Sequence, residues 1–276
     1  LENLRSFGIK GHALEFMRCS FAGRRGRVDV NNYKSEWRDD PKGLFQGWPV
    51  ASIAFIYYVA DFAIIDKMPG ISIPCYADDT SIVTDGTVVN GPELTAVLNR
   101  AIEVARYIAR KKELIFVPSK QMYFVVHKTV SDEDHPDLYL NLHMCGTPIK
   151  KVYGVVRILG LFIDRRMNWE HHIKLVVNRA QVAYDAIYHR YKNALYIKAS
   201  WVPTIMEAYV LSKMSYMVGV WGQASTNALR PARVLYNNMV RYAQSACHST
   251  GLDFEHILLR WPRFEDWCLG KRAAMF

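Results

Sequence analysis

Residues 71–84, ISIPCYADDTSIVT, place two adjacent carboxylates, Asp78 and Asp79, inside a run of strand-forming residues. The apolar residues on both sides are β-branched, a type that favours strands: Ile71, Ile73, Ile82 and Val83. We therefore predict strands at 71–76 and 80–84 that form a hairpin, with the acids at or near its turn. The apolar flanks indicate that this hairpin is at least partly buried.

Paired carboxylates in such a place need an explanation. In a low dielectric they repel each other and lose hydration, which costs several kcal/mol each unless a cation compensates. Magnesium is a natural partner, because proteins hold it by one or two carboxylates together with substrate phosphates. The chemistry that fits is phosphoryl transfer with two metal ions. The alternative is an ordinary exposed turn, in which aspartate is common and has no catalytic role.

The first half of the chain alternates helix and strand signals. Residues 49–66 are almost entirely apolar and predict a buried helix. The stretch 31–43 is polar and predicts a loop. A helix is expected from Gly91 onward, with one apolar stripe and its cations off that stripe. A further strand pair is plausible at 114–117 and 122–127.

A change of composition at 128–148, first acidic and then rich in Pro and Gly, suggests a domain boundary. We expect domains at 1–140 and 141–276. The second begins with a short strand at 157–164, and the remainder is mainly helical.

Composition narrows the class of protein. Half of the 276 residues are hydrophobic, which is enough for a sizeable core. No apolar run reaches the roughly 18 residues of a membrane span, so we expect no membrane partner. The net charge is +9, which favours a polyanionic partner such as nucleic acid. Five scattered cysteines indicate a reducing, intracellular compartment and argue against a zinc site.

Several motifs in order resemble the reverse transcriptases of non-long-terminal-repeat (LINE-type) retrotransposons. YADD, residues 76–79, looks like that family's acidic box. GLFQGWPV (43–50) is similar to its GLPQGSPL segment, and FAGRRGRVDVN (21–31) to the stretch after its first catalytic box. LIFVPSKQMYFVV (114–126) resembles the segment that carries a family lysine. RILGLFIDRRMNWEHHI (157–173) and YMVGVWG (216–222) resemble its primer-grip and thumb signatures.

The resemblance implies an α+β fold: a right-hand polymerase palm, with an antiparallel sheet backed by helices, followed by a mostly helical thumb. It implies an RNA-directed DNA polymerase that uses deoxynucleoside triphosphates and Mg²⁺, or Mn²⁺, on an RNA template and a DNA primer. By analogy, the primer would be nicked chromosomal DNA. A nuclear and cytoplasmic location is expected for the family.

The same resemblance assigns candidate site residues. Asp78 and Asp79 would be catalytic and bind the metal, and Lys120 would lie near the triphosphate as a general acid or counter-charge. Residues expected to contact the nucleotide, template or primer are Gln46, Gly47, Tyr76, Ala77, Arg24, Arg25 and Arg27. The alternatives are a solvent-exposed lysine for Lys120 and a solvated loop for the arginines.

Two aromatic residues of the second domain receive a structural prediction instead. We expect Trp169 to be a packing residue and His172 to be a helix-capping or core-edge histidine. Basic residues on the helices that follow are candidates for contact with a duplex backbone.

The chain departs from the family in two places. Phe45 and Trp48 stand where the family has Pro and Ser, and the Trp48 indole would crowd the nucleotide site. The family also has another metal-binding aspartate, on a strand before the segment that matches residues 1–30, and Asp29 is poorly placed to replace it. We therefore expect a truncated copy that is inactive by itself. The alternatives are a non-catalytic nucleic-acid-binding remnant, or an enzyme whose missing part is encoded upstream.

Overall fold

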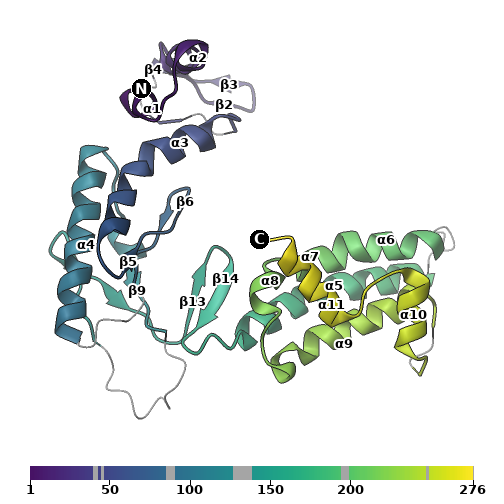
Figure 1. Cartoon of the computed structure of the whole chain (residues 1–276). Coiled ribbons are helices and arrows are strands. Elements are labelled where there is room, and N and C mark those ends of the chain that lie inside the picture. Colours follow the sequence, from purple (N-terminus) through teal and green to yellow (C-terminus); the bar gives the residue numbers. More distant parts are fainter. Residues whose placement is uncertain are drawn as a thin grey trace. The chain divides into compact units, whose positions relative to one another are not determined.

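The computed structural model of the protein describes residues 1–39, 43–44, 47–84, 91–126, 139–193, 199–246 and 249–275. The chain divides into two compact units (Figure 1). The first comprises Leu1–Gln121 with Leu138–Lys150, and the second comprises Met122–Asp137 with Lys151–Phe276. The chain is a mixed α+β protein that is mostly helical, and its described strands form only two-stranded sheets.

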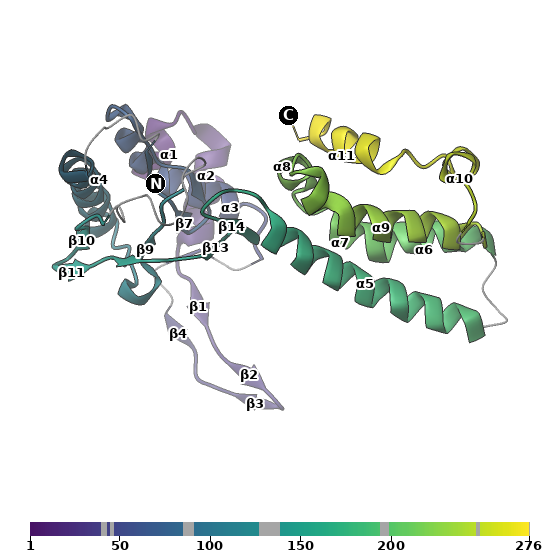
Figure 2. The same cartoon turned by 90° about the horizontal axis from the view of Figure 1, so that it is seen from below.

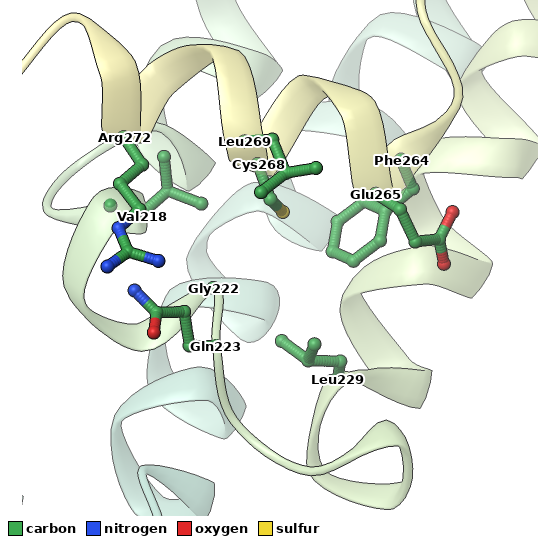
Figure 3. Close-up of a pocket in the computed structure, with 10 residues that line it drawn as sticks. Val218, Gly222, Gln223, Leu229, Phe264, Glu265, Cys268, Leu269 and Arg272 are labelled. Atoms are coloured by element: carbon green, nitrogen blue, oxygen red, sulfur yellow. The ribbon is translucent and has the colours of Figure 1, made fainter.

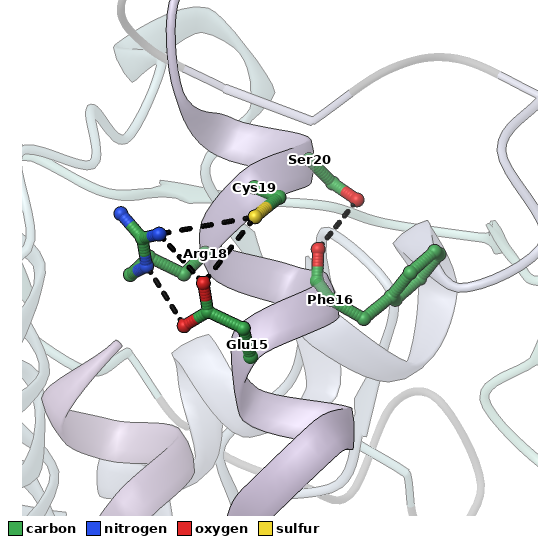
Figure 4. Close-up of polar contacts among 5 residues, drawn as sticks. All are labelled: Glu15, Phe16, Arg18, Cys19 and Ser20. Carbon is green, nitrogen blue, oxygen red and sulfur yellow. Dashed lines mark hydrogen bonds and ion pairs between the residues drawn. The ribbon is translucent and has the colours of Figure 1, made fainter.

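Three helices near the start of the chain pack together: α1 (Glu2–Ser6), α2 (Gly11–Phe21) and α3 (Ala51–Val59). Their contact is a small apolar cluster of Leu4, Met17 and Ala54, each at most 7% exposed. The side of α2 shown in Figure 4 is polar: the Arg18 guanidinium donates to both Glu15 carboxylate oxygens, at 2.6 and 2.9 Å. This bond lowers the pKa of Glu15 to about 2. Both side chains are exposed, so the pair adds little to stability.

The helix expected at 49–66 forms, but the prediction that it is buried is wrong. It consists of α3 followed by the 3₁₀ helix η1 (Ala60–Lys67). Phe62 and Ile65 of η1 are buried, whereas Ile53, Ile56 and Ile64 are 53–60% exposed. The helix buries the faces that pack against neighbouring segments: α1 and α2 against α3, and residues 71–72 and 91–111 against η1. Its high apolar content therefore does not lead to burial on every side.

Residues 25–39 form a two-stranded arm where the sequence predicted mainly a loop. β1 (Arg25–Gly26) pairs with β4 (Arg38–Asp39), and β2 (Asp29–Val30) pairs with β3 (Tyr33–Lys34). Asn31 and Asn32 form the tip with φ of 50° and 67°. Both angles lie in the left-handed region of the two-residue hairpin turn, which asparagine tolerates better than most residues. Figure 2 shows this arm projecting from the rest of its unit.

Helix α4 (Gly91–Lys111) confirms the helix that was expected from Gly91. Its apolar stripe is buried: Leu94, Leu98, Ala101, Ile102, Ala105 and Ile108. The Asn99 side chain connects α4 to a hairpin of β10 (His143–Met144) and β11 (Thr147–Pro148), since it donates to the Asn141 carbonyl and accepts from the His143 amide. The Lys112 ammonium is buried against Asp61 at 2.9 Å, although the sequence placed this cation off the apolar stripe and therefore away from the core.

The strand pair expected at 114–117 and 122–127 is largely wrong. Residues 114–117 form no strand, and the 3₁₀ helix η2 (Pro118–Lys120) follows them. β9 (Met122–Tyr123) pairs instead with β12 (Lys150–Lys151).

The single strand expected at 157–164 is a hairpin. β13 (Val155–Ile158) and β14 (Leu161–Asp164) pair antiparallel over four residue pairs. Leu159 and Gly160, with φ of 47° and 84°, form the two-residue turn between them.

The rest of the second unit is helical, as expected. In chain order its helices are α5 (Glu170–Asn193), η3 (Ala199–Trp201), α6 (Val202–Met206), the π-helix η4 (Glu207–Leu211), α7 (Ser212–Met214), α8 (Val218–Trp221), α9 (Thr226–Ala243), α10 (Leu252–Leu259) and α11 (Phe264–Ala273). α5 and α9 run alongside each other over one large apolar core (Figure 2). Its fully buried members include Met206, Trp221 and Tyr236.

Among the helices of the described ranges, none combines the length and apolar character that crossing a bilayer requires.

Candidate active site at the acidic hairpin

The predicted hairpin at 71–84 is present. β5 (Ile71–Ser72) pairs with β8 (Val83–Thr84), and β6 (Cys75–Tyr76) pairs with β7 (Asp79–Thr80), all in one register. The Ser81 amide donates to the Pro74 carbonyl at 3.1 Å between the two ladders. Pro74 has no N–H to donate, which explains why the strand pairing is interrupted there.

The base of the hairpin is fixed to the helical part of its unit. Ile71 and Ile73 are 6% and 5% exposed, and strand β5 packs against η1. The Ile73 amide also donates to Oδ1 of Asp66 at 2.6 Å. A buried base with a side-chain anchor holds the tip in a defined place.

The tip carries the two acids in solvent. Ala77 and Asp78 form the turn, with φ of 50° at Ala77, and Asp79 lies opposite Tyr76 in the ladder. All four side chains are exposed, Tyr76 at 68%. The expectation that the carboxylates lie in a low dielectric is therefore wrong, because they extend beyond the last buried residue pair. Water can hydrate both, so a cation is not required to balance them in the free chain.

The hairpin tip offers the kind of ligand that magnesium prefers, but too few of them. Two neighbouring carboxylates supply hard oxygen ligands, and substrate phosphates commonly supply the rest. Over the described residues, no group of three or more acidic, His or Cys side chains is arranged to hold a metal ion. The tip is thus a half-site that substrate oxygens would have to complete.

Lys120, the other predicted catalytic residue, ends the 3₁₀ helix η2. Its side chain is exposed and makes no hydrogen bond or ion pair with any part of the chain that the structure describes.

The predicted nucleotide-binding segment is described only in part. Gln46 and Phe45 lie outside the described residues. Gly47 has φ of 79°, a backbone conformation that side chains rarely adopt. The Trp48 indole packs near the Phe16 and Phe21 rings, with centroids 6.0 and 5.9 Å away. The expected crowding of a nucleotide site by Trp48 stays a prediction.

The three arginines differ in their surroundings. Arg24 is 9% exposed, and its Nη1 donates to the Gly43 carbonyl at 2.8 Å, so it braces the segment before Gly47 instead of lying in a solvated loop. Arg25 lies on the arm, 3.5 Å from Asp39. The Arg27 guanidinium lies 4.8 Å from the centre of the Trp37 ring, on the same arm. Arg25 and Arg27 are exposed and accessible to a polyanion.

In the second unit, the residues of the 157–173 motif shape the start of α5 and pack in the core. The Asp164 carboxylate accepts from the amides of Arg166, Asn168 and Trp169 at 2.9–3.2 Å and so shapes the start of α5. Trp169 is 8% exposed in the core, which confirms its predicted packing role.

His172 was expected to cap a helix or lie at the core edge, and it is buried more deeply than that. It is 1% exposed, and its Nδ1 accepts from the Phe162 amide at 3.3 Å. Burial lowers the pKa of this imidazole, and the nearby charges of Arg179 and His171 act in the same direction.

Two aromatic residues of the 216–222 motif complete this structural set. The Tyr216 hydroxyl donates to the Leu159 carbonyl at the turn of the β13–β14 hairpin. Trp221 is fully buried, and its Nε1 donates to the Tyr216 carbonyl at 2.9 Å. In this unit the motif residues hold the hairpin against the helices.

A small, partly open pocket of about 140 Å³ lies between α8, α9 and α11 (Figure 3). Its wall is largely apolar, formed by residues such as Val218, Leu229 and Phe264. The Cys268 thiol lines it, and burial raises the pKa of this thiol to about 12, so it stays protonated and unreactive. With an apolar wall and a protonated thiol, this pocket shows no catalytic group.

Sequence reasoning gave no prediction for the loop between α10 and α11. That loop reads Arg-Trp-Pro-Arg, residues 260–263, and borders a second, open pocket with His256. The available signal was two arginines flanking an aromatic residue, a pattern that is common on surfaces.

No protein-family model matches this chain, and comparison with curated proteins finds no match either.

Proposed function

We propose that this chain is the reverse transcriptase part of a LINE-type retrotransposon, which extends a DNA primer on an RNA template. The observation that carries the proposal is the acidic hairpin: Asp78 and Asp79 stand at the tip of an antiparallel hairpin whose base is anchored on a helix. The ordered motifs around it support the same assignment. In this proposal the first unit corresponds to a palm and the helical second unit to a thumb.

In this proposal, each candidate residue has one role in nucleotide addition. Asp78 and Asp79 would hold the metal together with the triphosphate oxygens. A magnesium ion held there would supply Lewis-acid activation of the primer hydroxyl and charge neutralisation at the leaving pyrophosphate. Lys120 would offer a proton or a positive charge to that leaving group. Arg25 and Arg27 on the arm would bind template or primer phosphates.

Exposure of the tip favours a second candidate function. A half-site of two hydrated carboxylates, with no third acidic ligand among the described residues, suits a protein that binds nucleic acid without adding nucleotides. Such a remnant would share the basic arm and the net charge of +9.

Primer extension on an RNA–DNA primer–template separates the two candidates. The assay compares the wild-type chain with Asp78→Asn and Asp79→Asn, and uses Asp185→Asn, an exposed acid of α5, as the matched control. Magnesium-dependent extension that is lost in Asp78→Asn and kept in Asp185→Asn supports the polymerase. Because the turn acids are exposed, neither variant should alter folding.

Binding without extension, with an affinity that falls steeply with salt, fits the remnant and also an enzyme whose missing part is encoded upstream. For that case Mn²⁺ binding with a non-hydrolysable deoxynucleotide, followed by electron paramagnetic resonance, tests whether Asp78 still holds a metal. A chain that shows neither extension nor salt-sensitive binding overturns both candidates.

A further inference from the structure

The second unit contains an open pocket of about 370 Å³ at the end of α10. It is a shallow depression, largely open to solvent. Its lining residues are Asp253, His256, Arg260, Trp261, Pro262 and Arg263. None of them belongs to the acidic hairpin or to the motifs discussed above, so the inference does not depend on the proposed function.

Two guanidinium groups make the rim an anion site. Arg260 lies at the end of α10 with φ of 57°, and it forms no ion pair with the described residues. Arg263 donates through Nη2 to Oδ1 of Asp253 at 2.8 Å. Both partners of this pair are mostly exposed, at 63% and 75%, so the pair is weak and can be exchanged. Guanidinium groups bind phosphate strongly because their planar donors match its oxygens.

The inner wall is aromatic and held in place. Tyr236 is fully buried, and its hydroxyl donates to the Pro262 carbonyl at 2.8 Å. The His256 and Trp261 rings lie 6.0 and 6.2 Å from the Tyr236 ring, between centroids. These contacts fix the aromatic residues of the wall before any ligand arrives.

His256 lies behind this wall and is 8% exposed. Its Nδ1 has no hydrogen-bond partner within the described residues, but that atom is closed to solvent and so does not face the open pocket. The ligand contacts therefore have to come from the arginines and Trp261.

We propose that this pocket binds a nucleotide unit, with its phosphate between Arg260 and Arg263 and its base against Trp261. Guanidinium donors beside a Trp ring suit a ligand that is anionic at one end and planar and aromatic at the other. The ligand could come from a free mononucleotide or from a nucleotide within a single strand, because both present this chemistry.

Titration of the whole chain, followed by amide chemical shifts of the second unit, tests the proposal. The probes are deoxyadenosine monophosphate, deoxyadenosine, inorganic phosphate and a short single-stranded oligonucleotide. We expect the monophosphate to bind about tenfold more tightly than either of its parts, since phosphate and base contribute together. Tighter binding of the oligonucleotide assigns the site to a strand, and tighter binding of the monophosphate assigns it to a free nucleotide.

The variants Arg260→Gln and Trp261→Leu should each weaken binding about tenfold. Lys271→Gln, an exposed cation on α11, is the matched control and should bind like the wild type. Circular dichroism checks that each variant is folded. The proposal is overturned if the monophosphate and the oligonucleotide both fail to saturate, if phosphate binds as well as the monophosphate, or if folded Arg260→Gln binds normally.

Discussion

At the scale of single residues, Asp164 is the polar side chain with the clearest structural task. Its carboxylate accepts hydrogen bonds from three backbone amides in the turn just before α5, those of Arg166, Asn168 and Trp169. None of these amides has a partner inside the helix. We expect Asp164→Ala to lower the free energy of unfolding by about 2–3 kcal/mol, since hydrogen bonds to a charged acceptor are stronger than neutral ones. Urea denaturation measures this change.

The matched control for Asp164 is Asp185→Ala. Asp185 is an exposed acid of α5 whose one side-chain hydrogen bond within the described residues comes from Gln181, so its loss should cost less than about 0.5 kcal/mol. Equal stability of Asp164→Ala and Asp185→Ala would show that the loop before α5 does not need this carboxylate.

His172 makes a prediction about pH. Burial holds its pKa below the ordinary value of 6.5, so in acid the unfolded chain binds the proton first. The free energy of unfolding should therefore fall as the pH drops below about 6.5, and it should be fully present at higher pH. His172→Gln removes this titrating group and should reduce the loss of stability on acidification.

The measurement is urea denaturation at about pH 7.5 and about pH 5.5 for the wild type, His172→Gln and His189→Gln. His189 is an exposed histidine of α5, and its variant should follow the wild type. If His172→Gln loses as much stability in acid as the wild type, the buried imidazole is not the group responsible.

At the scale of elements, helix α11 lies very close to α8. A Cβ added at Gly219 would lie 2.4 Å from Sδ of Met275 and 3.1 Å from Cα of Arg272. The methionine can move, but the α11 backbone cannot do so without shifting the helix. We expect Gly219→Ala to cost about 1–3 kcal/mol and to speed amide exchange in α11.

Gly270, within α11 itself, is the control for that prediction. A Cβ there meets nothing within 4 Å. Gly270→Ala should therefore stabilise the protein by up to about 1 kcal/mol, through helix propensity alone. A destabilising Gly270→Ala together with a neutral Gly219→Ala would contradict the packing of α11 on α8.

At the scale of the whole molecule, each of the two units has its own buried core. We expect calorimetry to show two thermal transitions, because separate cores need not melt together. Ile102→Ala, in the buried stripe of α4, should lower one transition by an amount equivalent to about 2–5 kcal/mol. Gly219→Ala should lower only the other. A single transition that both variants shift equally would show that the chain unfolds as one cooperative body.

The sequence by itself determined the local elements. β-branched residues on both sides of polar turn residues were sufficient to predict the hairpin at 71–84. Apolar residues at helical spacing were sufficient to predict α4. Both signals lie within one short segment of the chain. The packing role of Trp169 was also predictable. The arm tip at Asn31 and Asn32 and the turn at Gly160 were missed, although left-handed turn residues signal both.

Which side chains are buried was decided by the tertiary structure alone. Ile53 and Ile56 are exposed, Lys112 is buried, and the carboxylates of Asp78 and Asp79 extend into solvent, all against expectation. Periodicity states which face of an element is apolar, but burial also requires another segment to lie on that face. Which segments meet is set by the packing of residues far apart in the chain, and no local pattern encodes it.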